Sequence, residues 1–177
     1  MIPEGYQVEA LRIDHAAELV AAYDRNRAHL APWDPRRTED FYTLEGQTAV
    51  VVDQLSMAER GLVHPWVIVR DGLVVGRVNL NNVVMGVLRS ASVGYWVDAA
   101  HTGRGLATAA LLFSLERGRE RGLHRVEAGT LVHNTASQAV LTRCGFTHYG
   151  TAERYLFIDG AWQDHRLYQR ILHDDPL

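Results

Sequence analysis

Two glycines and an arginine stand between a strand-like segment and a helix-like segment near the middle of the chain. Gly103, Arg104 and Gly105 follow the β-branched and aromatic residues 92–97 and precede apolar residues at helical spacing from Leu106 onward. A helix N-terminus carries unpaired N–H groups and a partial positive charge, so a glycine loop there is suited to binding phosphate. The alternative is that the glycines only form the turn, as in many short loops.

Two other phosphate-binding motifs do not fit this segment. The dinucleotide fingerprint needs a third glycine where Thr108 stands, and residues 98–102 separate the loop from its strand. Glu127 has the spacing of the acidic residue in that fingerprint, but too few residues follow it to complete a doubly wound sheet. A P-loop is excluded because no Gly-Lys-Ser/Thr sequence follows.

Other side chains are candidates for proton transfer or for binding an acceptor. Each candidate base has a structural or solvated role as its alternative, and the four are His64, Asp98, Glu127 and His133. Aromatic residues are candidates for lining an acceptor pocket, with a core role as the alternative: Trp33, Trp66, Trp96, Trp162, Tyr95 and Tyr155. Three asparagines interrupt the alternation of apolar and polar residues over 73–83, and they either contact the acceptor or form a bulge. They are Asn79, Asn81 and Asn82.

The composition is that of one globular domain. The chain has 177 residues, 47% of them hydrophobic, so residues 1–177 are expected to form a single domain with a sizeable core. A net charge of −3 without a polybasic run argues against nucleic acid or an anionic membrane as a partner. Cys144 is the single cysteine, which excludes an internal disulfide and a paired-cysteine zinc motif and predicts a small buried hydrophobe. We expect a cytoplasmic protein without a bound metal, since no secretion signal or long apolar stretch is present.

The elements around the glycine loop predict an α+β fold with a mostly antiparallel sheet. Helices are expected from Asp14, which would cap the first one, and over residues 38–60, 106–121 and 134–144. Strands are expected over residues 6–13, 64–71, 73–83, 89–98 and 124–132, followed by a hairpin over residues 155–172 that turns at Asp159 and Gly160.

Residues 94–111, GYWVDAAHTGRGLATAAL, resemble motif A of the GCN5-related N-acetyltransferases (GNAT), in the RimJ/RimL-like branch that acetylates amino groups, including the N-termini of ribosomal proteins. The family pattern Gln/Arg-x-x-Gly-x-Gly/Ala maps to residues 102–107, and this chain departs from the pattern at its first position, where Thr102 replaces Gln or Arg. Three further segments resemble the family in the same order, so the resemblance covers nearly the whole chain. They are NRAHLAPW (26–33), NTASQAVLTRCGF (134–146) and DGAWQDHRLYQRIL (159–172).

The resemblance implies a GNAT fold whose central sheet splays between its fourth and fifth strands and holds acetyl-CoA there. Pantetheine would pair with backbone groups of Tyr95, Trp96 and Val97, while Asn134 matches a cofactor-side asparagine of the family. The diphosphate would lie on the glycine loop, with Arg104 as a charged contact, and the expected cofactor residues there are Thr102, Gly103, Arg104, Gly105, Leu106, Ala107 and Thr108.

The resemblance also implies transfer of the acetyl group to a primary amine. Ser137 matches a serine proposed in the family as the acid for the leaving thiolate, although Thr135 and Gln138 also form a capping-box pattern there. Some relatives place a glutamate where this chain has Leu156, so the base stays unassigned. The acceptor is a protein N-terminus or a small amine such as an antibiotic or polyamine, and Trp33, Asn79, Asn81 and Tyr95 are its candidate contacts. A non-catalytic acyl-CoA-binding module is the alternative function, and a homodimer is expected because relatives often form dimers.

Overall fold

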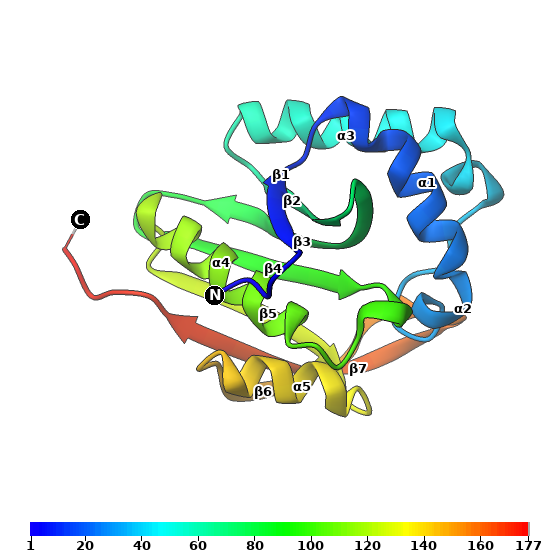
Figure 1. Cartoon of the computed structure of the whole chain (residues 1–177). Helices are drawn as coiled ribbons and strands as arrows, with labels where there is room; N and C mark the ends of the chain where they lie inside the picture. Colours follow the sequence, from blue (N-terminus) through cyan, green and yellow to red (C-terminus); the bar gives the residue numbers. More distant parts are fainter. Residues whose placement is uncertain (177) are drawn as a thin grey trace.

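The computed structural model describes residues 1–176 as a seven-stranded mixed sheet with helices on both faces (Figure 1). The strands lie in the order β1-β2-β3-β4-β5-β7-β6, and the neighbours are antiparallel except for β4 and β5. Their bounds are Gln7–Ala10 (β1), His64–Arg70 (β2), Leu73–Val84 (β3), Ser90–Val97 (β4), Arg125–Leu131 (β5), Thr147–Ile158 (β6) and Ala161–Ile171 (β7).

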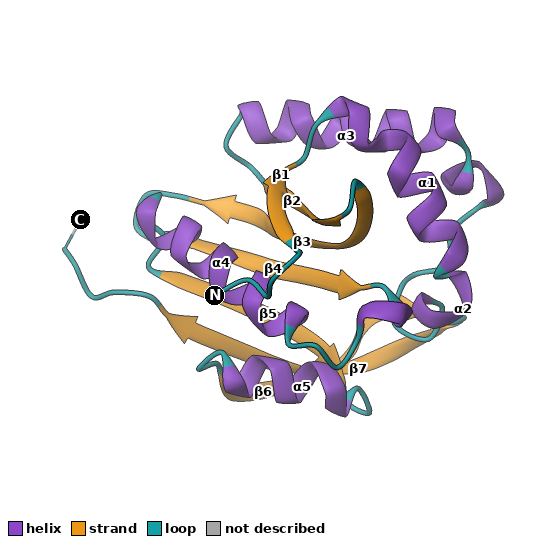
Figure 2. Ribbon diagram, in the orientation of Figure 1, coloured by secondary structure: helices purple, strands orange, loops and turns teal. Residues whose placement is uncertain are grey.

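The helices form a layer on each side of this sheet. Helices α1 and α3 cover one face and α4 and α5 the other, while the short α2 follows α1 directly (Figure 2). Within residues 1–176 the α-helices are Ala16–Arg25 (α1), Arg27–Leu30 (α2), Leu44–Glu59 (α3), Leu106–Glu120 (α4) and Thr135–Arg143 (α5). This is the mixed α+β arrangement that the sequence predicts.

Each face of the sheet has its own hydrophobic cluster because side chains alternate along a strand. On β2, Val67 belongs to the cluster with Leu19 of α1, whereas its neighbour Ile68 belongs to the cluster with Leu111 of α4. All four side chains are at most 1% exposed. Burying a side chain of this size contributes about 1.5–3 kcal/mol, so both helical layers are held by the sheet between them.

The sheet opens between β4 and β5, as predicted. Within the described chain these strands pair only over three positions, from Ser90 with Arg125 to Ser92 with Glu127, although β4 continues to Val97 and β5 to Leu131. On its other side β4 stays paired with β3, and β5 stays paired with β7. The facing edges of the diverging halves therefore keep main-chain groups that an extended ligand can pair with.

Two helix starts differ from the prediction. Asp14 does not cap α1: its carboxylate accepts from Arg12 Nε at 3.1 Å, and the 3₁₀ turn Ile13–His15 precedes the helix. The helix expected from residue 38 begins only at Leu44, after a second 3₁₀ turn. Its cap is Thr43, whose Oγ1 accepts from the Gly46 N–H at 3.0 Å.

Strand ends differ as well. The first strand is shorter than residues 6–13, at Gln7–Ala10. The final hairpin is longer than expected because β6 begins at Thr147, and its pairing with β7 contains two register shifts. A strand interrupted in this way loses the regular alternation that identifies strands in a sequence.

Candidate active site

The glycine loop follows β4 and leads into the N-terminus of α4. Gly103 and Gly105 have φ of 73° and 76°, a backbone conformation that strongly favours glycine. The first intrahelical hydrogen bond runs from the Ala109 N–H to the Gly105 carbonyl at 2.9 Å, so the N–H groups of residues 106–108 have no acceptor within the helix. Residues 102–105 are exposed. The glycines therefore both form the turn and leave free donors at the positive end of a helix, as a phosphate site requires.

The side chains of this loop contribute less than its backbone. The Thr102 hydroxyl donates to the Ala99 carbonyl at 3.0 Å and closes the short 3₁₀ turn before the loop. Leu106 is buried in the core, and Ala107 and Thr108 are partly buried. These residues therefore face a ligand mainly with their main-chain N–H groups.

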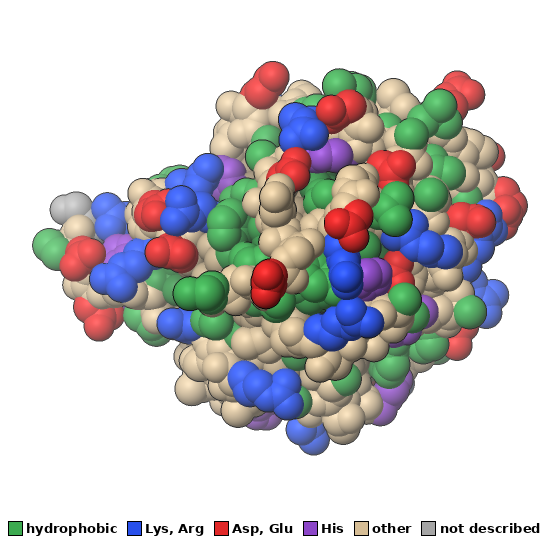
Figure 3. All heavy atoms as spheres, in the orientation of Figure 1, with side chains coloured by type: hydrophobic (Ala, Val, Ile, Leu, Met, Phe, Trp, Pro, Cys, Tyr) green, Lys and Arg blue, Asp and Glu red, His purple; other side chains and the backbone are tan. Residues whose placement is uncertain are grey.

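A cationic cluster that the sequence analysis did not identify lies beside the loop. The Tyr6 hydroxyl accepts from Arg70 Nη1 at 2.9 Å and from Arg104 Nη1 at 3.3 Å, and it lies 2.9 Å from His101 Nδ1. Figure 3 shows arginine and histidine side chains side by side on the face that α4 covers. Tyr6 and Arg104 are 98 positions apart, so no local sequence pattern relates them. The cluster adds positive charge next to the free N–H groups of the loop.

Two hydroxyl groups meet across the region where β4 diverges from β5. The hydroxyls of Tyr95 on β4 and Ser137 on α5 lie 2.9 Å apart, and both residues are partly buried. Burial raises the pKa of Tyr95 to about 12, despite its hydrogen bond to Ser137. Tyr95 is therefore protonated at neutral pH and can donate to the Ser137 oxygen. This contact joins Tyr95, which is predicted to bind the cofactor and the acceptor, to Ser137, which is predicted as the general acid.

The predicted cap of α5 is wrong. Asn134 is the N-cap, and its Oδ1 accepts from the Ser137 main-chain N–H at 3.0 Å, so Thr135 lies inside the helix as its first residue. The Gln138 side chain turns instead to the carbonyls of Leu131 and Val132. The Asn134 side chain thus has a structural partner in addition to the cofactor role predicted for it, and this bond fixes the position of Ser137 in the first turn of α5.

Two of the four candidate bases are occupied by structural hydrogen bonds. The buried Asp98 accepts from Arg25 Nε at 2.6 Å and from Asn26 Nδ2 at 2.9 Å. Burial opposes ionisation of Asp98, but these bonds and one from the Ala100 N–H lower its pKa below the ordinary value. Glu127 accepts from Arg125 and from the Tyr149 hydroxyl, in the part of β5 that pairs with β4.

The two candidate histidines lie in different places. His64 is the first residue of β2 and lines a separate depression with Arg121. Burial lowers the pKa of His64, and the positive charge of Arg121 lowers it further. His133 follows the end of β5, and its ring centroid lies 5.7 Å from that of Trp33, after α2. Of the four candidates, His133 is the one that contacts a predicted acceptor residue, Trp33. It lies just after β5, where that strand has separated from β4.

The structure separates the predicted acceptor residues. Trp96 turns to the α1 face, where its Nε1 donates to the Tyr23 hydroxyl at 3.2 Å. Asn82 has a φ of 51° at the irregularity between β3 and β4, which bears out the bulge for this residue. Asn79 lies opposite Gly94 of β4, and its buried Oδ1 has no hydrogen-bond partner among residues 1–176. Trp66 is a core residue and Trp162 is exposed.

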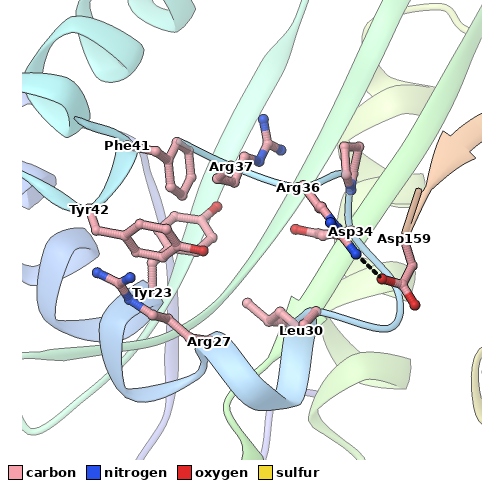
Figure 4. Close-up of a pocket in the computed structure, with 11 residues that line it drawn as sticks. Tyr23, Arg27, Leu30, Asp34, Arg36, Arg37, Phe41, Tyr42 and Asp159 are labelled. Atoms are coloured by element: carbon pink, nitrogen blue, oxygen red, sulfur yellow. Dashed lines mark hydrogen bonds and ion pairs between the residues drawn. The ribbon is translucent and has the colours of Figure 1, made fainter. Parts of the chain in front are cut away.

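A pocket of about 240 Å³ lies beside α2 and was not anticipated from the sequence (Figure 4). It is lined by three aromatic rings, three arginines and two carboxylates, and also by Leu30, Ala31 and Pro35; the charged and aromatic residues are Tyr23, Phe41, Tyr42, Arg27, Arg36, Arg37, Asp34 and Asp159. Burial raises the pKa of Asp34 above its ordinary value, and Arg37 opposes this shift. Asp34 directly follows Trp33, a predicted acceptor contact and the last residue of the segment 26–33 that resembles the family, and this is the one sequence signal near the pocket.

Other kinds of site were sought in the same described residues. Residues 1–176 contain no group of three or more His, Cys, Asp or Glu side chains placed to hold a metal ion. None of the helices in this part of the chain is long and apolar enough to cross a membrane. Cys144 is buried, as predicted, and burial raises the pKa of its thiol, which makes it a poor nucleophile.

Comparison with known proteins agrees with this geometry. Residues 7–147 match the family model described as "Acetyltransferase (GNAT) domain". The [Ribosomal protein uS5]-alanine N-acetyltransferase of Escherichia coli is 33% identical over 159 residues, which cover 86% of this chain and 80% of that protein. The crystal structure of the ribosomal-protein-S5-alanine acetyltransferase from Vibrio fischeri has a TM-score of 0.94 at 31% identity and covers 99% of this chain and 98% of that one. Mycobacterium smegmatis RimJ, solved with CoA-disulfide, has a TM-score of 0.90 at 36% identity and covers 94% and 81%. The chain belongs to the GNAT acetyltransferase family.

Proposed function

We propose that this protein transfers the acetyl group of acetyl-CoA to the α-amine of a protein or peptide N-terminus, and that residues 1–177 act as one N-acetyltransferase domain. The observation that carries the proposal is the combination of diverging strands, a glycine loop with free N–H groups and the Tyr95–Ser137 hydroxyl pair at one end of the sheet. A relative that is 33% identical is an N-acetyltransferase for the alanine of ribosomal protein uS5, which supports a peptide amine as the acceptor.

In this proposal acetyl-CoA lies between β4 and β5. Main-chain groups of residues 95–97 pair with pantetheine, and the N–H groups of residues 103–108 bind the diphosphate, with Arg104 adding charge. The residues present fit such a ligand, since the loop is exposed and its glycines leave open space where side chains would stand. Complexes of relatives with CoA support the same assignment.

The transfer needs an oxyanion donor and a proton for the departing sulfur. The amine nitrogen forms a bond to the thioester carbonyl carbon, and the carbon–sulfur bond breaks when the tetrahedral intermediate collapses. A main-chain N–H beside Val97 stabilises the oxyanion in this proposal. Ser137 gives its proton to the sulfur and recovers one from Tyr95, which burial keeps protonated.

The test is an acceptor screen with purified protein. Release of CoA thiol is followed with acetyl-CoA and peptides that differ in their first residue, with polyamines and antibiotic amines as the competing class. Mass spectrometry then locates the acetyl group. Residues 1–177 contain no lysine, so no lysine side chain among them competes with the added amine for the acetyl group. Peptide-dependent thiol release and an Nα-acetylated product are expected, whereas tight acetyl-CoA binding without release on any amine would favour the non-catalytic module.

Two finer expectations belong to the same proposal. Ribosomal proteins as acceptors are consistent with an enzyme that works in the cytoplasm. A homodimer is tested by sedimentation of the purified chain, with the mass of one or two chains as the readout.

A further inference from the structure

The pocket beside α2 contains a carboxylate that no residue of the described chain neutralises. Its arginines have other partners: Arg27 Nη1 bonds to both Glu39 oxygens at 3.0 Å, Arg36 Nη2 lies 3.1 Å from Asp159, and the Arg37 guanidinium lies over the Phe41 ring at 4.8 Å. Within residues 1–176, Asp34 makes no ion pair within 4.0 Å and accepts no hydrogen bond at its carboxylate. Among the described residues, Asp34 is therefore the carboxylate of this pocket without an ion-pair partner, and Arg37, whose guanidinium turns to the Phe41 ring, is the arginine without one.

The walls of the pocket suit a small cation. Figure 4 shows the Asp34 carboxylate pointing toward the side of the pocket that holds the tyrosine rings, while Arg36 turns to Asp159. Two of the pocket's three aromatic rings already hold a guanidinium group, Phe41 that of Arg37 and Tyr42 that of Arg27, so Tyr23 is the ring left to attract an ammonium group. The volume of about 240 Å³ is somewhat below the roughly 300–1,000 Å³ of most small-molecule sites, which fits the end of a peptide better than a whole ligand.

Two contacts connect the pocket to the ends of the diverging strands. Tyr23, in its wall, accepts a hydrogen bond from Trp96 of β4. Trp33, next to Asp34 in the chain, stacks on His133 just after β5. The pocket thus lies on the α1 face of the sheet at the end where β4 and β5 separate, opposite the helices α4 and α5 that carry the glycine loop and Ser137. An acceptor entering here approaches the thioester from the face away from the cofactor loop.

We propose that Asp34 binds the ammonium group of the acceptor and takes its proton; this inference rests on the proposed function. One proton moves from the ammonium nitrogen to the Asp34 carboxylate, and the freed lone pair attacks the thioester carbon. After the carbon–sulfur bond breaks, the sulfur holds the proton from Ser137, and the second amine proton leaves to water. Asp34 then returns its proton to solvent and Tyr95, which reprotonated Ser137, takes one up from solvent, so each turnover releases one net proton.

The charges that face Asp34 come from four groups, and Arg37 among them opposes the effect of burial on the Asp34 pKa. Arg37 and Arg36 lie on its own loop, Arg27 on α2 and Asp159 on the turn after β6, and Asp159 is neutralised by Arg36. A carboxyl whose pKa burial raises is a stronger base than an exposed one. It also costs folding stability when ionised, because the carboxylate loses hydration in the pocket.

The experiment compares Asp34→Asn with Asp24→Asn as a matched control. Asp24 is an exposed carboxylate on α1 that pairs with Arg27 and does not line the pocket. Asp34→Asn is expected to lower kcat/KM for peptides at least 100-fold at neutral pH, with acetyl-CoA affinity unchanged and a Tm equal to or above that of the parent. The deficit should narrow as the pH rises from about 7 to 9, because more of the α-amine, whose pKa is about 8, then arrives neutral. Asp34→Glu should recover part of the activity, and the control should match the parent.

Each outcome decides between the two proposals. Parent-like kcat/KM in Asp34→Asn, or a loss that does not change with pH, overturns the role of Asp34 while peptide transfer by the parent upholds the proposed function. Transfer to small amines alone, with the same loss in Asp34→Asn, upholds the role of Asp34 and refutes a peptide acceptor. Absence of transfer to any amine by the parent overturns both.

Discussion

Replacing Ser137 with alanine tests whether the hydroxyl pair between β4 and α5 acts in the transfer. The Ser137 oxygen lies 2.9 Å from that of Tyr95, which is protonated at neutral pH because burial raises its pKa to about 12. Loss of one general acid or one transition-state donor lowers kcat by roughly 10- to 1000-fold, or about 1.4–4 kcal/mol. We expect Ser137→Ala to fall in this range while its affinity for acetyl-CoA stays close to that of the parent.

The same substitution should change the fold little. The cap of α5 is the bond from the Ser137 main-chain N–H to Asn134 Oδ1, and alanine keeps that N–H. One partly buried hydrogen bond between side chains is lost, which costs about 1 kcal/mol. For a chain of this length that lowers Tm by about 2–4 °C. Asn134→Ala is the matched control for the cap and should lose about 0.5–2 kcal/mol of stability.

The assay is thiol release with a saturating amine acceptor, supported by single-turnover measurements that isolate chemistry from product release. Tyr95→Phe and the double variant complete a cycle: if the two hydroxyls act as a unit, the double variant loses little more than Ser137→Ala alone. A Ser137→Ala enzyme with parental kcat, under conditions where chemistry limits the rate, would remove Ser137 from the mechanism.

Three further predictions concern the loop, the cosubstrate and the anchor of β4. Gly105→Val and Gly61→Val both place a β-branched residue at positive φ with open space around it, so both should destabilise the fold, but only Gly105→Val should weaken acetyl-CoA binding by calorimetry; equal affinities would place the phosphate elsewhere. Acetyl-CoA at about 100 times its Kd should add roughly 2.7 kcal/mol and raise Tm by about 5–10 °C, and a thermal shift with NAD alone would contradict the cosubstrate. The pKa of Asp98 is lowered in the fold, so its stabilisation is present above pH about 4 and is lost as pH falls through the folded value. Urea unfolding should therefore show a shallower acid limb for Asp98→Asn, which also loses the contacts to Arg25 and Asn26 at neutral pH; an unchanged acid limb would refute the assignment.

The sequence by itself determined the loop, the fold class and the family. Gly103 and Gly105 are recognisable because the backbone has positive φ at both positions, and a backbone requirement of this kind favours one residue type, glycine. The strands and long helices are likewise visible, since burial on one or both faces fixes the period of the apolar residues. The order of these segments predicts a mostly antiparallel sheet, and the resemblance to the family implies that this sheet opens between its fourth and fifth strands. The pairing of β4 and β5 confirms the opening.

Tertiary structure decided which polar side chains meet. Asp98 and Glu127 looked like bases in the sequence, yet partners many positions away engage them: Asn26 is 72 residues from Asp98, and Tyr149 is 22 from Glu127. Asp34 is the opposite case, an acidic residue in a loop with two prolines. Its carboxylate is left without an ion-pair partner in the described chain, where α2, the 3₁₀ turn Glu39–Tyr42 and the turn between β6 and β7 come together. Helix periodicity and turn propensity are local, whereas hydrogen-bond partners and pKa shifts depend on which distant segments pack against a group. For that reason the glycine loop before α4 could be predicted from the sequence, and the hydrogen-bond partners of the acidic residues could not.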